Sequence, residues 1–275
     1  CVAGHTAGSD GFECSACEAG TYKSTAGTGE CSRCPALSST DAEGSTSQED
    51  CICTAGAYGE AGGACTLCEV GSWCSGSTNY SCPVYSSSGA GSSSLTDCEC
   101  VAGYVGANGG LCGLCSPDHW CPGGNVSEAC AVHSSSPHGS SSQAECICVG
   151  GYQGEAGGPC TLCPADSYCA SGTLSVCPDH AASVSGSDNV TDCQCKAGFY
   201  GEDGRECSVC PAKSYCEGGK SVVSCGEHSE SPGGSNSSEA CTCEAGWYGP
   251  QGGACTLCEE GYWCWGGLSN SCPSH

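Results

Sequence analysis

Cysteine is the residue type whose number and spacing in this sequence could do chemistry. The 275 residues include 35 cysteines, set in a frame that repeats every 47 or 48 positions. The frame opens with C-x-C, and a third cysteine follows twelve residues later. Two residues separate the third and fourth cysteines, five separate the fourth and fifth, and seven or eight separate the fifth and sixth. Fifteen more residues precede the next C-x-C. The frame is read from Cys51, Cys98, Cys146, Cys193 and Cys241.

Cysteines at C-x-C and C-x2-C spacing can bind zinc or oxidise to disulfides. Four N-x-S/T sequons favour oxidation, because such acceptors have meaning only in a secreted chain. We therefore expect disulfides, an extracellular, secreted or cell-surface location, and N-glycans at the sequon asparagines. These are Asn79, Asn125, Asn189 and Asn236.

The composition indicates how such a chain could fold. It has two Phe, no Met and 45 Gly, so a unit of this size buries too little apolar surface to offset its chain entropy. Disulfides that close loops of about 10–20 residues would each contribute on the order of 3 kcal/mol. No helical periodicity is present. The predicted fold is therefore small and disulfide-rich: a tandem array of short β-hairpin, loop-rich cysteine-rich modules with little regular secondary structure.

The frame also predicts the repeat boundaries. Both ends of the chain fall inside a frame, so we expect the sequence to be cut from a longer array. The predicted domains are a partial repeat at 1–50, repeats at 51–97, 98–145, 146–192 and 193–240, and a truncated repeat at 241–275.

The first repeat suggests a pairing because it deviates. Lys23 stands where Cys74 stands in the next repeat, and Cys34 follows Cys31 as an apparent extra cysteine. If the lost and the gained cysteine serve one partner, each repeat is bridged to the next C-x-C. Six cysteines allow fifteen connectivities, so this is one hypothesis among several. It predicts the pairs Cys34–Cys51, Cys74–Cys98, Cys121–Cys146, Cys53–Cys65 and Cys68–Cys82.

A family resemblance rests on the stretch C-E-A-G-T-Y-K-S-T-A-G-T-G-E-C-S-R-C-P and on S-S-T-D-A-E-G-S-T-S-Q-E-D-C-I-C-T-A-G-A-Y-G after it. These residues resemble the ephrin-receptor-like cysteine-rich repeat, which is related in style to growth-factor-like modules. The resemblance implies an extracellular repeat architecture more than an activity. Similar arrays occur in protist and algal extracellular proteins, including mastigonemes, the flagellar hairs.

Aromatic residues recur at two places in the frame. One follows a glycine after each C-x-C, where we expect a positive-φ turn with the ring over a disulfide. The other precedes the fifth cysteine and could form an exposed interface, although packing between repeats is the simpler interpretation. This second row consists of Trp73, Trp120, Tyr168, Tyr215 and Trp263.

Histidines and acids recur as well. A histidine lies three residues after the sixth cysteine in four repeats, with Tyr85 in a fifth. A row of pH-sensitive or metal-binding groups is one interpretation. We expect instead partly exposed rings that hydrogen-bond the adjacent serines. Acids before the C-x-C pairs signal calcium only weakly, and no other cofactor or metal site is predicted. The histidines are His133, His180, His228 and His275, and the acids are Asp50, Asp97, Glu145 and Asp192.

Charge and the remaining motifs narrow the function. A net charge of −24 argues against nucleic acid as a partner, and no apolar run is long enough for direct membrane insertion. No catalytic motif is present, so we expect no enzyme. The serine-rich runs 86–94, 134–142 and 229–238 predict O-linked sugars.

Two functions fit. The nearly uniform repeats favour a structural component of an extracellular glycoprotein filament, such as a flagellar hair or surface fibre. Its partners would be itself or other filament subunits. The alternative is the stalk or ligand-binding ectodomain of a cell-surface receptor or adhesin.

Overall fold

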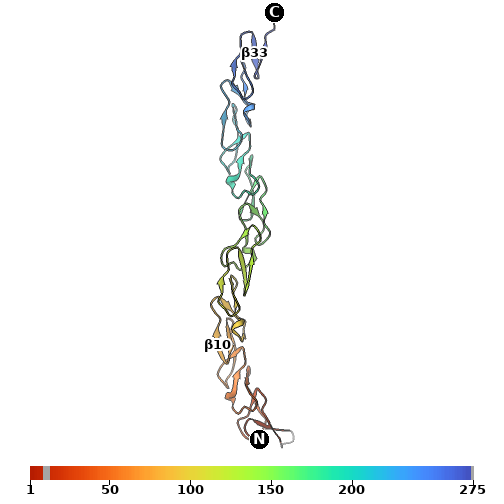
Figure 1. Cartoon of the computed structure of the whole chain (residues 1–275), viewed down its shortest axis with the longest axis vertical. Coiled ribbons are helices and arrows are strands. Elements are labelled where there is room, and N and C mark those ends of the chain that lie inside the picture. The colour runs from red at the N-terminus through yellow and green to blue at the C-terminus, as the bar shows by residue number, and fades with distance from the viewer. Residues whose placement is uncertain (9–12, 274–275) are drawn as a thin grey trace. The chain divides into compact units, whose positions relative to one another are not determined.

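The chain folds into short two-stranded antiparallel hairpins joined by loops (Figure 1). The structure, a computed structural model, describes residues 1–8 and 13–273. In this part of the chain every strand pairs with one other strand, and the helices are single 3-10 turns. The predicted disulfide-rich, hairpin-based fold class is confirmed.

Two compact units make up the chain. The first contains residues 1–130 and 136–145, and the second contains residues 131–135 and 146–275. Within each unit the colours of Figure 1 follow chain order, so each repeat lies beside its sequence neighbours. The repeat boundaries expected from the cysteine frame stay predictions.

Each repeat starts with a first hairpin, which follows the opening C-x-C. Its strands are only two or three residues long, because a glycine precedes one strand and a cysteine follows the other. The pairs are β1 (His5–Ala7) with β2 (Cys14–Ala16), β7 (Ala57–Tyr58) with β8 (Thr66–Leu67), β13 (Tyr104–Val105) with β14 (Gly113–Leu114), β19 (Tyr152–Gln153) with β20 (Thr161–Leu162), β25 (Phe199–Tyr200) with β26 (Ser208–Val209), and β31 (Trp247–Tyr248) with β32 (Thr256–Leu257).

A second hairpin follows, and in every repeat but the first its leading strand contains the fifth cysteine or ends directly before it. Several of its turns have two central residues with positive φ, such as Gly266 at 59° and Gly267 at 81°, a geometry that matches the twist of short hairpins. The pairs are β3 (Thr21–Tyr22) with β4 (Ser32–Arg33), β9 (Ser72–Ser75) with β10 (Thr78–Ser81), β15 (His119–Gly123) with β16 (Val126–Ala129), β21 (Ser167–Ala170) with β22 (Thr173–Val176), β27 (Ser214–Tyr215) with β28 (Val223–Ser224), and β33 (Tyr262–Trp265) with β34 (Leu268–Ser271).

A junction ladder then pairs the strand after the sixth cysteine with the next C-x-C, so it connects one repeat to the next. A 3-10 turn lies just before each of these C-x-C pairs. The ladders are β5 (Ser38–Thr40) with β6 (Cys51–Cys53), β11 (Ser86–Ser87) with β12 (Glu99–Cys100), β17 (Ser134–Ser135) with β18 (Ile147–Cys148), β23 (Ala181–Ala182) with β24 (Gln194–Cys195), and β29 (Ser229–Glu230) with β30 (Thr242–Cys243). The turns are η1 (Gln48–Asp50), η2 (Leu95–Asp97), η3 (Gln143–Glu145), η4 (Val190–Asp192) and η5 (Ser238–Ala240).

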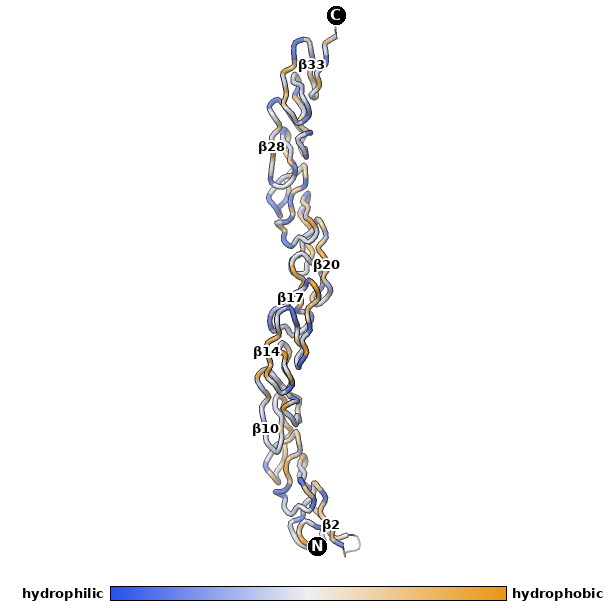
Figure 2. The backbone as a smooth tube through the Cα atoms, viewed as in Figure 1, coloured by the Kyte–Doolittle hydropathy of each residue, from blue (hydrophilic) through white to orange (hydrophobic). Residues whose placement is uncertain are grey.

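The core of each repeat is a disulfide between two backbone segments. In the second repeat, Cys68 and Cys74 are 1% and 0% exposed. Gly56 brackets them: its N–H donates to the Cys74 carbonyl, and its carbonyl accepts from the Cys68 N–H. On the other side, the Cys68 carbonyl accepts from the Gly91 N–H. Apolar residues occur only in short stretches between polar ones (Figure 2), so cystine takes the place of an aliphatic core.

We call Gly56 and its counterparts the central glycines. A residue with a side chain cannot replace Gly56. Gly56 has φ of +84°, and a Cβ there would lie 2.2 Å from the Gly91 carbonyl oxygen. The predicted positive-φ turn is confirmed at Gly56 and at its counterparts Gly103, Gly151, Gly198 and Gly246.

Candidate functional site

The disulfides of the junctions are the first part of the candidate site. The structure contains two of the predicted bridges, Cys34–Cys51 and Cys53–Cys65, with Cα–Cα distances of 5.7 and 5.6 Å. Cysteine oxidation, rather than zinc binding, is therefore the chemistry of the frame. Within the described residues, Cys272 is the one free cysteine, and it is exposed.

Three predicted bridges are wrong. Cys74 is bonded to Cys68, so neither Cys74–Cys98 nor Cys68–Cys82 forms. Cys121 is likewise bonded to Cys115, which excludes Cys121–Cys146. The physical reason is the central glycine, whose N–H and carbonyl hold the fourth and fifth cysteines side by side.

The bridge into the next repeat still exists, but it uses the sixth cysteine. Cys82 is bonded to Cys98, the first residue of the next C-x-C. The equivalent pairs are Cys177–Cys193 and Cys225–Cys241. Each of these repeats is therefore covalently joined to its successor, as the sequence suggested, by a different cysteine.

The first repeat explains the error. Cys17 is bonded to Cys31, so Cys31 is the gained cysteine and replaces the one lost at Lys23. Cys34 is the counterpart of Cys82. The sequence carried this signal, because Cys34-Pro35 and the following serines match the Cys-Pro-and-serine stretch after Cys82.

Lys23 occupies the buried position of the missing cysteine. Its backbone makes the same contacts as Cys74, because the Gly4 N–H donates to the Lys23 carbonyl. Lys23 is only 6% exposed, and its Nζ donates to the carbonyls of His5 and Gly27 at 2.8 and 2.6 Å. The ammonium group thus gives two carbonyls a donor at this position, while the bridge from Cys17 runs to Cys31 instead.

Stacked rings form the second part of each junction. The ring three residues after the sixth cysteine stacks on the ring of the next repeat's first hairpin. Their centroids are 3.6–4.2 Å apart and their planes within 11° of parallel. The pairs are Tyr85–Tyr104, His133–Tyr152, His180–Phe199 and His228–Trp247.

The backbone holds the first ring of each stack in place. Tyr85 and the histidines have φ of 57° to 66°, a conformation that non-glycine residues rarely adopt. Their carbonyls accept a hydrogen bond from the residue after the next C-x-C, for example from Val101 to Tyr85 and from Val149 to His133. The strained residue is therefore fixed from the neighbouring repeat.

The histidine and aromatic expectations need correction. The described histidines of this row are exposed, and they stack on rings instead of hydrogen-bonding serine. The neighbouring hydroxyl of Ser134 instead donates to the Ala131 carbonyl, three residues before it. The ring after the central glycine lies on the ring of the preceding repeat, where the sequence predicted a disulfide beneath it. His275 lies outside the described residues.

Two junctions add ion pairs of opposite polarity at equivalent positions. Asp166 faces Lys196 at 3.5 Å, whereas Lys213 faces Glu244 at 2.9 Å. The hydrogen bond to Lys213 lowers the pKa of Glu244, and the same bond raises the pKa of Lys213. Both pairs are largely solvent-exposed, so neither adds much to stability.

The acids before the C-x-C pairs act as helix caps. Asp97 accepts from the amides of Ser93 and Ser94 at 2.8 and 2.9 Å, closing a capping box on η2. Asp50 and Asp192 do the same on their turns. Within the described residues, no group of three or more His, Cys, Asp or Glu side chains could hold a metal ion. Calcium binding stays an expectation without a built site.

Sequence reasoning missed the buried serines of the serine-rich runs. Ser88, Ser136 and Ser231 are 3–7% exposed. Their hydroxyls donate to carbonyls of the second hairpin, such as Ser88 to Ser72 at 2.6 Å. These serines are structural, so the O-linked sugars expected from the sequence would be confined to exposed hydroxyls of the runs.

The predicted aromatic row lies on the second hairpins. Trp73, Trp120, Tyr168 and Tyr215 are half-buried, and Trp263 is 53% exposed. Trp73 stacks on Tyr80 of its own hairpin at 4.5 Å. Whether the row forms an interface stays a prediction.

The four sequon asparagines are all exposed. Asn79 lies on β10, and Asn125 follows the turn glycine Gly124 of the third repeat's second hairpin. Asn189 is the N-cap of η4, with its Oδ1 accepting from the Thr191 amide. Their positions are compatible with the expected N-glycans.

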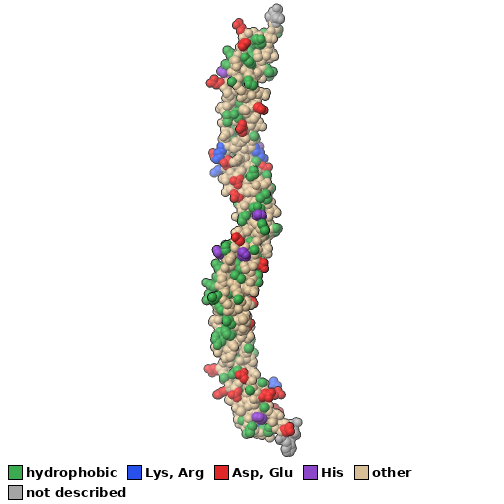
Figure 3. All heavy atoms as spheres, viewed as in Figure 1, with side chains coloured by type: hydrophobic (Ala, Val, Ile, Leu, Met, Phe, Trp, Pro, Cys, Tyr) green, Lys and Arg blue, Asp and Glu red, His purple; other side chains and the backbone are tan. Residues whose placement is uncertain are grey.

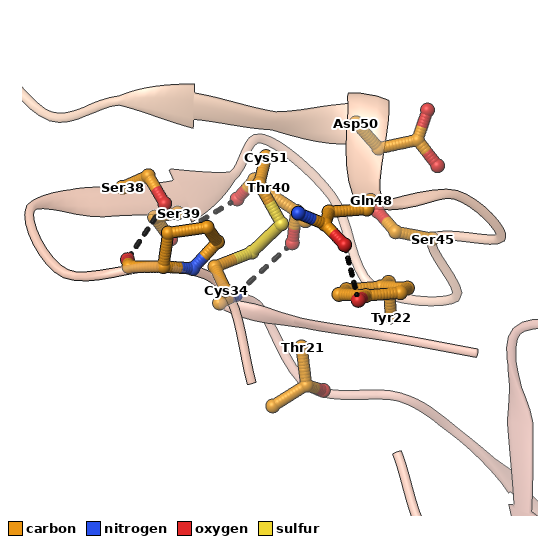
Figure 4. Close-up of a disulfide and its surroundings, with 12 residues drawn as sticks. Thr21, Tyr22, Cys34, Ser38, Ser39, Thr40, Ser45, Gln48, Asp50 and Cys51 are labelled. Carbon is orange, nitrogen blue, oxygen red and sulfur yellow. Dashed lines mark hydrogen bonds between the residues drawn. A yellow bond between two sulfur atoms is a disulfide. The ribbon is translucent and has the colours of Figure 1, made fainter. Parts of the chain in front are cut away.

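Figure 4 shows the first junction. The Cys34–Cys51 disulfide lies beside Gln48, whose Oε1 accepts from the Tyr22 hydroxyl at 2.9 Å. The Gln48 amide donates to the Gly62 carbonyl of the second repeat's first hairpin. One side chain therefore links both repeats at this junction, where Leu37 and Ala57 stand in place of the stacked rings.

The surface carries shallow hollows and scattered charge. One hollow of about 720 Å³ is lined by residues 182–187 and 194–197 together with Asp192 and Glu217. Figure 3 shows acidic side chains spread over the visible face and basic ones in few places. The helices within residues 1–8 and 13–273 fall short of the length and hydropathy that a membrane-spanning helix requires.

Comparisons with known proteins agree with this architecture. The family model described as tyrosine-protein kinase ephrin type A/B receptor-like matches residues 4–51. The chain is 47% identical over 64 residues to cysteine repeat modular protein A of Toxoplasma gondii, and 42% identical over 79 residues to protein B of that organism. It is also 47% identical over 58 residues to the Mus musculus protein named for its sushi, von Willebrand factor type A, EGF and pentraxin domains.

These matches cover 20–28% of this chain and 1–2% of the relatives. They support a cysteine-rich repeat array of extracellular type, with a structural or ectodomain role. The relatives are named for their repeats and domains, and none is named as an enzyme.

Proposed function

We propose that the array is a disulfide-stapled spacer of an extracellular glycoprotein, and that it assembles laterally or end to end into a filament such as a flagellar hair or surface fibre. The observation that carries the proposal is the recurring junction. A bridge from the sixth cysteine, a backbone hydrogen bond and, in four cases, stacked rings join one repeat to the next.

Such a junction suits a load-bearing spacer. Each repeat depends on its neighbours rather than on a common core, so length can grow by adding copies. The covalent bridge prevents a repeat from separating from its successor when the chain is pulled. The partners would be further copies or other filament subunits, with N- and O-linked glycans on the exposed surface.

A stalk or ligand-binding ectodomain of a receptor or adhesin is the second candidate. The relatives favour it, because the matching segments are small parts of long modular proteins. A spacer within such a protein would use the same junctions without forming a fibre.

Negative-stain microscopy and sedimentation of the secreted, oxidised 275-residue chain separate the two candidates. The filament proposal expects oligomers or fibres that lengthen with protein concentration. A particle that stays monomeric, with one repeat binding a soluble ligand, would overturn the filament and leave the ectodomain.

A further inference from the structure

Each junction presents a compact apolar patch at the surface. It consists of the residue three positions after the sixth cysteine, the residue after the next central glycine, and the residue opposite that one in the first hairpin. We call it the junction patch. The five patches are Leu37, Ala57 and Leu67; Tyr85, Tyr104 and Leu114; His133, Tyr152 and Leu162; His180, Phe199 and Val209; and His228, Trp247 and Leu257. In the first of them Ala57 is buried, so that patch exposes Leu37 and Leu67 alone.

The geometry joins the three members of a patch. Tyr104 and Leu114 are direct partners in the β13–β14 register, so their side chains lie on the same face of the hairpin. Tyr85 stacks on Tyr104 at 4.2 Å and continues that face. The same register pairs Tyr152 with Leu162.

The aliphatic member is exposed in every patch. It is always Leu or Val, directly before the fourth cysteine, and its exposed fraction is 51–62%. It lies over a glycine of the serine-rich loop: a Cβ on Gly139 would be 3.0 Å from Leu114 Cδ1, and one on Gly186 would be 3.3 Å from Leu162 Cδ1. A chain with so few large apolar residues thus exposes one at the same place in each of the five repeats after the first.

One patch is too small to hold a partner. Half-exposed aromatic and aliphatic side chains present on the order of 200 Å² per patch, whereas a stable interface buries about 800 Å² per partner. Several successive patches must therefore act together. The first compact unit contains two of them and the second contains three.

We propose that the junction patches are the surface on which a second copy of this chain docks. This inference rests on the proposed filament function and names its contact surface. A partner that engages successive patches must repeat its own apolar sites with the same spacing and the same rotation from one site to the next. A second copy meets both conditions, because the same junction generates its patches.

Charge sets the conditions for this contact. The chain carries a net charge of −24, so two copies repel each other at low ionic strength. Salt screens exposed charges, with a Debye length of about 10 Å at 0.1 M, and leaves apolar contact intact. Association through the patches therefore strengthens as salt is added, the reverse of a contact made by ion pairs.

The test compares three secreted, oxidised full chains by sedimentation equilibrium at low and high salt. The first is wild type. The second carries serine at the aliphatic patch positions, namely L67S, L114S, L162S, V209S and L257S. The third is the control and carries serine at exposed apolar positions outside the patches, namely V70S, L111S, V126S, L174S and V176S.

We expect wild type and control to associate more tightly at high salt, and the patch variant to associate at least about tenfold more weakly. Non-reducing peptide maps verify that all three chains keep the native bridges. Should the patch variant misfold, carbene footprinting of wild type replaces it, and Leu162 should be labelled less as concentration rises.

The outcomes separate the two proposals. Equal association of the patch variant and the control, or unchanged footprinting of Leu162 in an associating chain, overturns the junction patches and leaves the filament standing. A wild-type chain that stays monomeric at every concentration and salt overturns both.

Discussion

At the scale of single residues, one position with an unusual backbone conformation connects each repeat to the next. The position three residues after the sixth cysteine accepts leucine, tyrosine or histidine, and all of them adopt positive φ. The shared requirement is a side chain that lies on the next repeat and a backbone carbonyl that accepts a hydrogen bond from an amide of that repeat. Titration or metal binding by histidine is not needed to explain the row, since Tyr85 fulfils the same role.

Lys23 offers a direct test of how the position of the missing fifth cysteine is stabilised in the first repeat. We expect Lys23→Met to lower the free energy of unfolding of the first repeat by about 1–3 kcal/mol, because two carbonyls lose their buried donor. Denaturant unfolding without reductant, followed by hydrogen exchange of the Gly4 amide, measures this.

The matched control restores the frame of the later repeats. The double variant K23C/C31S should form a bridge between Cys17 and the new thiol at position 23, and it should remain folded. If Cys17 instead remains a free thiol in that variant, Lys23 is not the counterpart of Cys74.

Glu145 makes the cap of η3 pH-dependent. The backbone N–H of Ser141, with its hydroxyl, lowers the pKa of the Glu145 carboxyl, which accepts from both at 2.8 Å. Since the folded-state pKa lies below the unfolded one, the stabilisation is present above the unfolded pKa. It is lost as the pH falls through the folded pKa.

We therefore expect the amides of Ser141 and Ser142 to lose protection from hydrogen exchange in acid, after correction for intrinsic rates, and E145Q to reduce this pH dependence. The turn η5 supplies an internal control, because Ala240 stands at the capping position and cannot titrate. Equal acid sensitivity in η5 would refute the role of Glu145.

At the scale of elements, one kind of bridge stabilises the inside of a repeat and another connects successive repeats. The bridge between Cys68 and Cys74 spans 6 residues and fixes the second hairpin on the central glycine. The bridge between Cys82 and Cys98 spans 16 residues and fixes one repeat on the next. The junction ladder and the stacked rings act at the same place as the longer bridge.

Removing each bridge should have a different effect. Loop-closure entropy assigns about 3 kcal/mol to the longer bridge and about 2 kcal/mol to the shorter one. The pair C82S/C98S should expose residues 83–97 to proteases while both flanking repeats stay folded. The pair C68S/C74S should expose the second hairpin of its own repeat. Limited proteolysis with mass mapping distinguishes them, and identical cleavage patterns would contradict the division.

At the scale of the whole molecule, solubility and association depend on opposing surface terms. Acidic side chains give a net charge of −24, whereas the junction patches expose apolar side chains at recurring positions of the sequence. Glycans at the exposed sequons would add a third term by covering surface away from the patches. The asparagines lie on second hairpins or near 3-10 turns, and no patch includes one.

Glycosylation predicts a measurable mass. The secreted chain should exceed its polypeptide mass of 27.1 kDa and lose the excess on enzymatic removal of N-glycans. Peptide mapping should find sugar at Asn79, Asn125, Asn189 and Asn236. If the secreted chain has the bare polypeptide mass, the glycan part of the proposed function is wrong, and the description of the junction is unaffected.

The sequence by itself determined the class of this protein. A cysteine frame with a fixed period, abundant glycine and few large apolar residues leave disulfide-linked hairpins as the available fold. The positive-φ glycines could be predicted for the same reason, since local conformation decides them. The bridges Cys34–Cys51 and Cys53–Cys65 were among the predicted pairs, although Cys31, and not Cys34, is the gained cysteine.

Only the tertiary structure decided which of the remaining cysteines meet. Cys68 and Cys74 come together because Gly56 hydrogen-bonds both, and this backbone contact has no trace in cysteine spacing. The stack of His228 on Trp247 joins residues of different repeats, so no local pattern marks them as partners. Periodicity therefore reveals that a position recurs, whereas the contact that explains its recurrence depends on how one repeat lies against the next.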